Sequence, residues 1–319
     1  MGDKTGIGWT DATWNPVRGC SRVSAGCENC YAETMAGRFK GEGMPYEGLI
    51  NKHGAWNGQI KLVPEKLDEP LRWTKPRRVF VNSMSDLFHE NVPFDYIESV
   101  FGVMARCQRH TFQILTKRPE RMREWFAHSM RESWSYWAPL MDKVEGAKRM
   151  SPEDWPGWPL PNVHLGVSVE DQATADERIP FLLDTPAAVR WVSYEPALGP
   201  VDFTNVARAH GYGNDVLHGY RHDFGVPMND LPASLDWIVV GGESGPGARP
   251  FYLDWARDTV QACADSGVPV FVKQIGSKPR DVATVGGNEL DLPVTNETRK
   301  GDDPAYWPDE IRVQEYPNG

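Results

Sequence analysis

The stretch VFVNSMSDLFHENVPFDYIESVFGVMARC, residues 79–107, decides the fold. It opens with the apolar run Val79 to Val81, which ends abruptly at polar residues. Pro93 then stands near the start of a segment whose apolar residues recur at helical spacing. A short buried strand, a polar loop and a helix make up one βα unit, so this stretch predicts such a unit.

The same pattern recurs along the chain. One more strand is expected over residues 12–17, in the segment ATWNPV. Five further apolar runs each end at polar or glycine residues: Thr116 and Lys117, Ser168 and Glu170, Ser193 and Glu195, Gly241 to Ser244, and Lys273 and Gln274. Strands that alternate with helices predict a parallel sheet covered on both faces. The sequence therefore predicts an α/β fold, a partial or complete (β/α) barrel of TIM-like type with inserted loops. Its site is expected at the carboxyl ends of the strands, where a doubly wound open sheet would also place it.

The barrel is expected over residues 1–276, with a C-terminal extension over residues 277–319 packed on it. Three insertions interrupt the alternation, at residues 40–76, 128–161 and 202–234. The first contains Asn57-Gly58, which is typical of a hairpin turn. It also contains the segment PEKLDEPLRW, residues 64–73, which favours a helix.

Composition bounds the class of protein. The chain has 319 residues, of which 40% are hydrophobic, a formal net charge of −10 and five cysteines. No run of about 18 apolar residues predicts a membrane span, and the N-terminus lacks the layout of a secretory signal, so a cytoplasmic protein with no membrane partner is expected. The negative charge excludes a generally basic surface that coats nucleic acid, although a local basic groove is compatible with it.

Cys20, Cys27 and Cys30 lie within eleven residues in a C-x6-C-x2-C spacing. In a reducing compartment clustered cysteines bind metal or act in catalysis more often than they form disulfides. A structural zinc ion needs four ligands, and the candidates for the fourth are His53, His89, Cys107 and Cys263. Three buried, unligated thiols are another alternative, but the loop is polar and turn-forming. Three thiolates can also hold a [4Fe-4S] cluster whose fourth iron stays open to an exogenous ligand, and we favour this interpretation.

Several segments together carry a family resemblance over roughly residues 6–276. They are WNPVRGCSRVSAGCENCYAETMAGRF, FVNSMSDLF, FQILTKRPERM, LGVSVEDQ, ADERIPFLL, VSYEPALGPV, LDWIVVGGESGPGARP and VPVFVKQIG. With these segments the chain resembles a phage- and prophage-associated three-Cys-motif family. That family is itself similar to radical S-adenosylmethionine (SAM) proteins, especially the spore photoproduct lyase branch.

The resemblance implies a barrel of radical SAM type, with a [4Fe-4S] cluster on Cys20, Cys27 and Cys30 and SAM bound to the open iron. In such enzymes SAM is cleaved to a 5′-deoxyadenosyl radical that abstracts a hydrogen atom from the substrate. The resemblance further implies a nucleic-acid base or nucleotide as substrate, and a bacterial host cell as location if the chain is phage-encoded. The chain departs from the usual C-x3-C-x2-C spacing, and Asn29 and Tyr31 flank the last cysteine where an aromatic residue commonly precedes it.

The polar residues at the strand ends are the candidate site residues. Ser83, Ser85 and Asp86 match the position that often holds the amino group of SAM, because an ammonium needs acceptors, and helix capping is their alternative role. Thr116, Lys117 and Arg118 suit a carboxylate or phosphate, and a surface Lys-Arg pair at the start of a helix is their alternative role. The expected cofactor contacts are Ser83, Ser85, Asp86, Thr116, Ser168, Gly241, Gly242, Glu243 and Ser244. The expected catalytic residues are Lys117, Glu170, Glu195 and Lys273.

Other functions stay open at this point. Residues 75–78 (KPRR), Lys117, Arg118, Arg121 and the Trp-rich insertion can form a stacking groove for a nucleic-acid strand or be scattered surface residues. A second metal and a solvated loop are both compatible with the group His210, His218 and His222. Two rival functions remain. One is a cluster-bearing binding or sensor protein that works with a partner protein encoded nearby, and the other is a zinc-stabilised barrel hydrolase.

Overall fold

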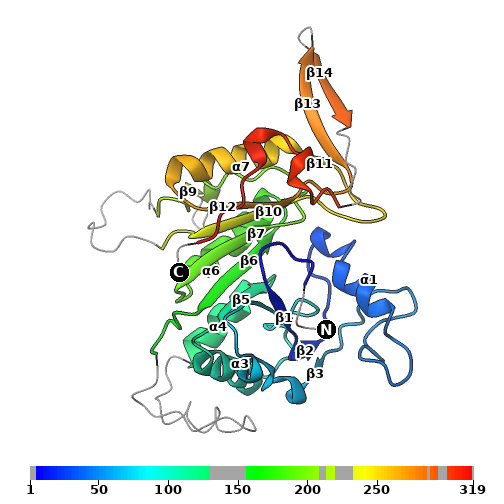
Figure 1. The fold of residues 1–319 in the computed structure, drawn as a ribbon, viewed down its shortest axis with the longest axis vertical. Helices are drawn as coiled ribbons and strands as arrows, with labels where there is room; N and C mark the ends of the chain where they lie inside the picture. Colours follow the sequence, from blue (N-terminus) through cyan, green and yellow to red (C-terminus); the bar gives the residue numbers. More distant parts are fainter. Residues whose placement is uncertain are drawn as a thin grey trace. The chain divides into compact units, whose positions relative to one another are not determined.

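The computed structural model describes residues 5–129, 156–207, 213–219, 233–285, 288–293 and 300–317. Its main element is a seven-stranded sheet with the order β1-β4-β5-β6-β7-β10-β12 (Figure 1). The strands are β1 (Ala12–Trp14), β4 (Arg78–Val81), β5 (Thr111–Thr116), β6 (Val163–Val169), β7 (Val189–Tyr194), β10 (Trp237–Gly241) and β12 (Val270–Gln274). Every strand expected from the apolar runs is present, so the α/β class is confirmed, and the sheet is that of a partial (β/α) barrel.

The chain forms two compact units. The first comprises Met1–Gly166 and Thr185–Ala188, and the second comprises Val167–Asp184 and Val189–Gly319. The division therefore falls inside β6. The expected division into a barrel and an extension after residue 276 stays a prediction.

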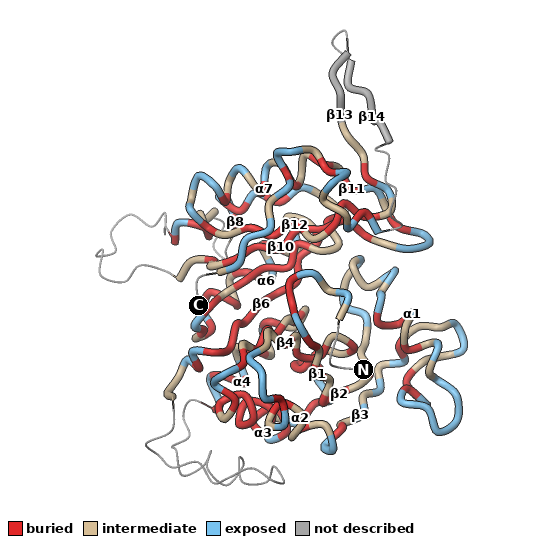
Figure 2. The backbone as a smooth tube through the Cα atoms, viewed as in Figure 1, coloured by how far each residue is buried: buried red, intermediate tan, exposed pale blue. Residues whose placement is uncertain are grey.

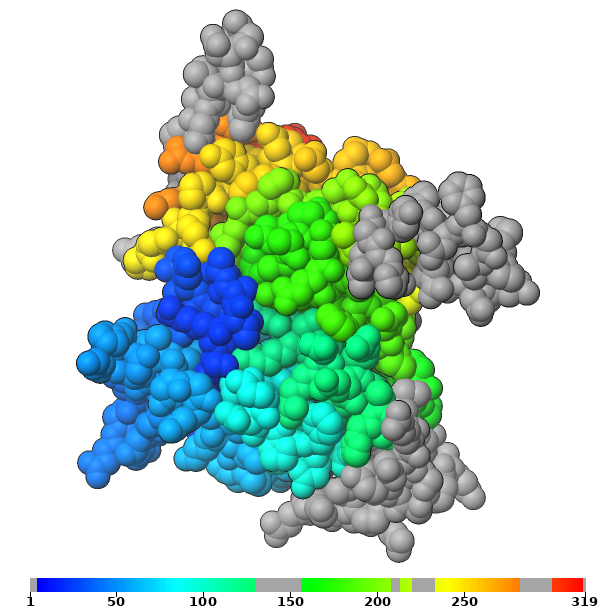
Figure 3. Space-filling view, turned by 180° about the vertical axis from the view of Figure 1, so that it is seen from behind, coloured from blue at the N-terminus to red at the C-terminus, as the bar shows by residue number. Residues whose placement is uncertain are grey.

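In the first unit β1, β4 and β5 run parallel, with Trp14 opposite Val81 and Val81 opposite Ile114. Helices α3 (Phe94–Arg106) and α4 (Pro119–Ser129) lie side by side, because Phe101 stacks on Trp125 with ring centroids 4.3 Å apart. Figure 2 shows α3 buried along most of its length. The opposite face appears in Figure 3, where residues near position 100 and those that follow them, coloured cyan to turquoise, reach the surface. Dense aromatic packing of this kind contributes much of the apolar burial that stabilises such a unit.

The insertion at residues 40–76 belongs to the first unit and differs from the expectation. The helix expected over residues 64–73 is split into a 3-10 turn, η2 (Pro64–Lys66), and a short α2 (Glu69–Arg72). A continuous helix is excluded because Pro70 lacks the amide that would bond to Lys66. Asn57-Gly58 does not form the expected hairpin turn either. The local bridge pairs Ile50 with Trp56, and the following β3 (Lys61–Leu62) pairs with β2 (Val17–Arg18) instead.

In the second unit β7, β10 and β12 run parallel, with Trp191 opposite Trp237 and Val239 opposite Phe271. Helix α6 (Gln172–Leu183) begins with a capping box formed by Asp171 and Thr174. The remaining elements are α7 (Leu253–Ser266), β8 (Val206–Ala207), β9 (Gly213–Asn214), β11 (Phe251–Tyr252), β13 (Pro279–Val285), β14 (Asn288–Pro293), η4 (Pro304–Tyr306) and η5 (Asp309–Ile311). Strand β13 pairs with both β11 and β14.

Most of the second expected insertion and much of the third lie outside the described residues, as do His210 and His222. Within the parts of the chain that are described, no helix is long and apolar enough to cross a bilayer.

Candidate metal and cofactor site

The loop that carries the three cysteines runs from β2 to α1 (Tyr31–Gly37) and contains the 3-10 turn η1 (Ala25–Cys27). All three cysteines are free thiols and half-buried. Gly19 fixes the start of the loop, because its φ is +91° and a Cβ there would lie 2.3 Å from the backbone oxygen of Gln59. Only glycine fits both the left-handed backbone and the close approach. Gly19 also forms a parallel bridge with Ser85, so the loop is tied to the end of β4.

The thiols face apolar as well as charged surroundings. Cys20 and Cys30 pack against a buried cluster formed by Ala32, Ala36, Tyr46, Leu49, Trp56 and Met84. Burial, together with the charge of Asp86, raises the pKa of the Cys20 thiol to about 12. Burial also raises the pKa of Cys30. Both groups are therefore neutral thiols near pH 7 unless a metal stabilises the thiolate.

The candidates for a fourth zinc ligand have other surroundings. His53 is exposed, and Cys107 and Cys263 are buried, at the end of α3 and inside α7. Burial raises the pKa of both buried thiols, to about 11 and about 12. Among the residues that the structure describes, no three Cys, His, Asp or Glu side chains are placed to hold one metal ion.

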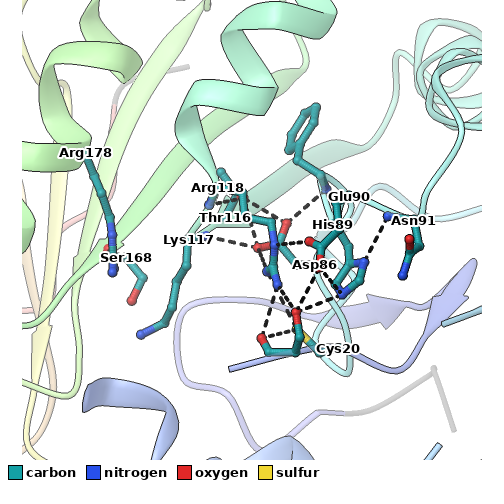
Figure 4. Close-up of polar contacts among 12 residues, drawn as sticks. Cys20, Asp86, His89, Glu90, Asn91, Thr116, Lys117, Arg118, Ser168 and Arg178 are labelled. Atoms are coloured by element: carbon teal, nitrogen blue, oxygen red, sulfur yellow. Dashed lines mark hydrogen bonds and ion pairs between the residues drawn. The ribbon is translucent and has the colours of Figure 1, made fainter. Parts of the chain in front are cut away.

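Asp86, which follows β4, is the centre of the polar network beside Cys20 (Figure 4). It is buried, and Thr116 donates its hydroxyl hydrogen to the carboxylate, with Oγ1 2.8 Å from Oδ1 and 3.0 Å from Oδ2. The backbone amides of Phe88 and Lys117 donate to it over 2.9 and 3.1 Å. Arg118 adds a charged bond over 3.1 Å. The carboxylate thus joins the ends of β4 and β5.

The two serines before Asp86 have structural partners. Ser83 donates its hydroxyl to Oδ1 of Asn15 over 3.2 Å, and Ser85 donates to the carbonyl of Val17 over 2.8 Å. These bonds attach the loop after β4 to the chain before the first cysteine. The alternative of helix capping does not hold for α3, because its N-cap is Pro93 and no side chain caps it.

Arg118 connects this network to the cysteine loop. Its Nη1 lies 3.8 Å from Sγ of Cys20, and its Nη2 donates to the carbonyl oxygen and the hydroxyl of Ser21 over 3.1 and 2.7 Å. Its Nε donates to Glu90 over 3.1 Å. The guanidinium group is held in place on all sides, as the sticks in Figure 4 show.

His89 is fully buried and hydrogen-bonded at both ring nitrogens. The amide of Asn91 donates to Nδ1 over 3.1 Å, so in the neutral ring the proton is on Nε2, which donates to the hydroxyl of Ser21 over 3.0 Å. The Ser21 hydroxyl in turn lies 3.3 Å from Glu90. Burial and the charge of Arg118 lower the pKa of His89. His89 therefore cannot take the proton of Ser21, which excludes a serine nucleophile activated by this histidine.

A second ion pair holds the far side of the cysteine loop. Glu33, buried on α1, accepts from Nε and Nη2 of Arg22 over 2.9 and 2.5 Å. It also accepts from the amide of Trp56 over 2.9 Å. Burial raises the pKa of Cys30 most, and the charge of Glu33 adds to the rise. This pair was not predicted from the sequence, although opposite charges within and just after a cysteine motif are a usable signal.

In the second unit Glu170 and Arg178 form a buried pair. Nη1 of Arg178 lies 3.2 and 3.1 Å from the two carboxylate oxygens of Glu170. The side chain of Arg178 is 2% exposed and that of Glu170 is 1% exposed. The same nitrogen donates to the carbonyl of Ser168 over 2.7 Å. Glu170 thus lies in a closed contact, which gives this expected catalytic residue a structural role.

Glu195 and Lys273 are brought together at the ends of β7 and β12. Nζ of Lys273 lies 2.7 Å from each carboxylate oxygen, and the side chains are 17% and 21% exposed. Gln274 donates to Glu195 over 3.1 Å and to the carbonyl of Gly242 over 2.8 Å. Ser168 donates its hydroxyl to the backbone oxygen of Glu195 over 3.2 Å. This group combines a carboxylate and an amine that solvent reaches.

Close packing explains the glycines in the segment Gly241 to Ser244. A Cβ on Gly242 would lie 2.8 Å from the oxygen of Ile275 and 2.8 Å from Cβ of Phe251. A Cβ on Gly241 would meet the oxygen of Gln274 at 3.3 Å. The carboxylate of Glu243 accepts hydrogen bonds from the backbone amide and the guanidinium group of Arg249, at 2.6 to 3.0 Å. Ser244 is half-buried.

Three of the arginines expected in a nucleic-acid groove have partners within the protein. Arg78 pairs with Asp11 over 3.0 Å, and Arg77 lies over the ring of Trp73 at 5.0 Å. Arg121 donates to the carbonyl of Val92 over 2.7 Å. Of the histidine group, only His218 lies within the described residues, where it pairs with Asp215 over 2.8 Å.

Comparison with known proteins identifies one family. The profile of the family described as "Protein of unknown function (DUF5131)" matches residues 4–299. No curated protein and no solved structure matches the chain.

Proposed function

The chain belongs to the DUF5131 family of proteins of unknown function, and from its residues we propose that it is a [4Fe-4S] protein of radical SAM type. Cys20, Cys27 and Cys30 would hold the cluster. The observation that carries this proposal is the set of three free thiols on one loop, flanked by the guanidinium groups of Arg118 and Arg22. The likeness to radical SAM proteins rests on the sequence motifs.

The chemistry of the donor set fits a cluster better than a zinc ion. A structural zinc ion needs four protein ligands that converge to about 2.3 Å or less from one point. The described residues provide no such group, and the candidate fourth ligand His89 already bonds through both ring nitrogens. A cubane binds each thiolate through a separate iron atom, so three cysteines suffice and need not converge on one point.

A bound cluster of this kind would supply an open iron for SAM and an electron for its cleavage. The chain itself supplies positive charge near the cysteines and excludes water from one side of them. Arg118 and Arg22 place two positive charges beside the cysteine loop, and positive charge favours the thiolate form that a metal binds. The apolar cluster beneath Cys20 and Cys30 limits the access of water from that side.

The two expected catalytic carboxylates differ in how far solvent reaches them. Glu170 is 1% exposed and bonded to Arg178, whereas Glu195 is 17% exposed and bonded to Lys273. A group that exchanges a proton with a substrate must be reachable, so Glu195 and Lys273 are the better proton-transfer pair. For the substrate we propose a nucleic-acid base or nucleotide, on the resemblance to the spore photoproduct lyase branch alone.

Anaerobic purification with metal, sulfide and product analysis tests the proposal. The expected result is a brown protein with about four irons per chain that forms 5′-deoxyadenosine from SAM on reduction. Single alanine variants of Cys20, Cys27 and Cys30 should each lose the iron, whereas Cys107→Ala and Cys263→Ala should retain it.

Each alternative has its own result. Iron without cleavage of SAM supports a cluster-bearing sensor that works with a partner protein. A colourless protein with one zinc per chain supports the zinc-stabilised hydrolase. Retention of iron in the Cys20, Cys27 and Cys30 variants would show that other residues hold the metal.

A further inference from the structure

We propose that Arg118 is a positioning residue for Cys20: it fixes the first cysteine of the loop and balances the negative charge that this cysteine carries as a metal ligand. The electrostatic part of this role depends on the proposed cluster, and the positional part does not. Arg118 and Cys20 are 98 positions apart in the sequence, so the contact is made by the fold alone.

The donor capacity of Arg118 matches its surroundings completely. A guanidinium group has five N–H donors in a planar fork. Nε donates to Glu90, and Nη1 contacts Asp86 and Cys20. Nη2 donates to the carbonyl oxygen and the hydroxyl of Ser21. Five donors thus meet five acceptors, and a lysine, with three donors on a flexible stem, cannot reproduce the arrangement.

The end of β5 places the guanidinium group. The hydroxyl of Thr116 accepts from the backbone amide of Arg118 over 2.9 Å and donates to the carboxylate of Asp86. This one hydroxyl therefore sets the turn from which the Arg118 side chain leaves, and it orients the carboxylate that Nη1 meets. The side chain of Arg118 is only 10% exposed, so solvent screens its charge weakly.

Charge balance explains why a cation is needed at this point. The carboxylate of Asp86 and the sulfur of Cys20 contact the same guanidinium nitrogen, Nη1 of Arg118. Arg118 contacts both groups, at 3.1 Å from Asp86 and 3.8 Å from Cys20. A thiolate at Cys20 without Arg118 would therefore leave two negative charges together in a half-buried site, which is unfavourable at low dielectric.

A redox titration of the reconstituted cluster, followed by electron paramagnetic resonance, tests the electrostatic role. A nearby positive charge stabilises the reduced cluster, so Arg118→Gln should shift the midpoint potential to a more negative value. Asp86→Asn removes a negative charge and should shift it to a more positive value. The matched control is Arg109→Gln, since Arg109 is a first-unit arginine that donates to the carbonyls of Trp73, Pro70 and Leu71. It should leave the potential unchanged.

A merely structural role would not produce shifts of opposite sign. If Arg118→Gln and Asp86→Asn shift the potential in the same direction, or if neither differs from Arg109→Gln, the electrostatic role is wrong. Arg118→Lys keeps the charge but not the fork, so it should stay nearer to the wild-type potential than Arg118→Gln does.

Alkylation of the metal-free protein tests the positional role without any cluster. The rate constant of the Cys20 thiolate with iodoacetamide, obtained by mass spectrometry from the pH dependence of alkylation, should be several-fold larger in Arg118→Gln than in the wild type, with that at Cys27 unchanged. Arg109→Gln should leave the rate at Cys20 as it is. An unchanged Cys20 rate in a variant whose circular dichroism shows a native fold would overturn the positional role. Failure of the wild type to bind iron would instead overturn the proposed function and the electrostatic role.

Discussion

Arg22, inside the cysteine motif, and Glu33, three residues after its last cysteine, form a two-bond ion pair, with Nε and Nη2 of the arginine 2.9 and 2.5 Å from the two carboxylate oxygens. The carboxylate is buried, whereas the Arg22 side chain is 44% exposed. Glu33 also accepts from the amide of Trp56, so it joins the cysteine loop to the insertion that follows it. The loop conformation thus depends on a residue that is not a cysteine.

Replacing Glu33 by glutamine tests this dependence. The variant keeps one oxygen acceptor but loses the charge, and we expect the free energy of unfolding to fall by about 1–3 kcal/mol. Urea unfolding measures the change. Glu28→Gln, at an exposed position of the same loop, is the control and should cost no more than about 0.5 kcal/mol. Equal losses in the two variants would show that Glu33 has no special role.

Gly19→Ala should destabilise the protein by about 2–4 kcal/mol, because it combines an unfavourable left-handed backbone with a clash. A Cβ at Gly19 would lie 2.3 Å from the oxygen of Gln59, at φ +91°. Gly43→Ala separates the two effects, since Gly43 has φ +71° and nothing within 4 Å of its ideal Cβ. It should cost only about 1 kcal/mol. Similar unfolding energies for both variants would contradict the close approach.

Glu170→Gln should destabilise the protein by about 3 kcal/mol or more, because it leaves the buried Arg178 without its anionic partner. Glu195→Gln should cost only about 1 kcal/mol, since Glu195 and Lys273 are partly exposed and solvent screens their interaction. Denaturant unfolding of the two variants at pH 7 compares them. A larger loss in Glu195→Gln would reverse the structural and chemical roles assigned to these carboxylates.

The stability of the protein should fall between pH 6.5 and pH 4. Burial lowers the pKa of His164 from 6.5 to about 4, so the unfolded chain binds a proton at a higher pH than the folded chain does. The stabilisation by neutral His164 is fully present above about pH 6.5. It is lost as the pH falls towards 4, by about 3 kcal/mol in all. Unfolding curves at pH 8 and pH 5 measure the loss.

His164→Leu should flatten this pH dependence, because no proton is then taken up at that position on unfolding. The buried histidines His89 and His110 also have lowered pKa values and leave a residual slope. A slope that His164→Leu does not change would show that folding does not lower the pKa of His164.

The strands of the sheet could be predicted because their signal is local. The run Val79 to Val81 and the other apolar runs need no knowledge of distant residues to be recognised. The cysteine loop was located in the same way. The prediction of a continuous helix over residues 64–73 was wrong because Pro70 cannot donate the backbone hydrogen bond that such a helix needs.

The partners within the site could not be predicted, because they are set by distant contacts. Ser85 bonds to Val17 across 68 positions, and Lys273 bonds to Glu195 across 78. Ser83, Ser85 and Asp86 were singled out as polar groups for a ligand, but sequence alone could not show that Asn15, Val17 and Arg118 already bond to them. Residue type identified the polar edge of the sheet, and the fold decided which groups remain available there.

The saturated fork of Arg118 limits what the anion specificity of this protein can be. A phosphate or carboxylate on an incoming molecule would have to displace Asp86, Glu90 or Ser21 before it could bond to this arginine. The salt dependence of any nucleotide binding should therefore contain no contribution from Arg118. Selectivity for a charged substrate must come from other cations. Arg118 therefore has a structural role and does not bind the substrate.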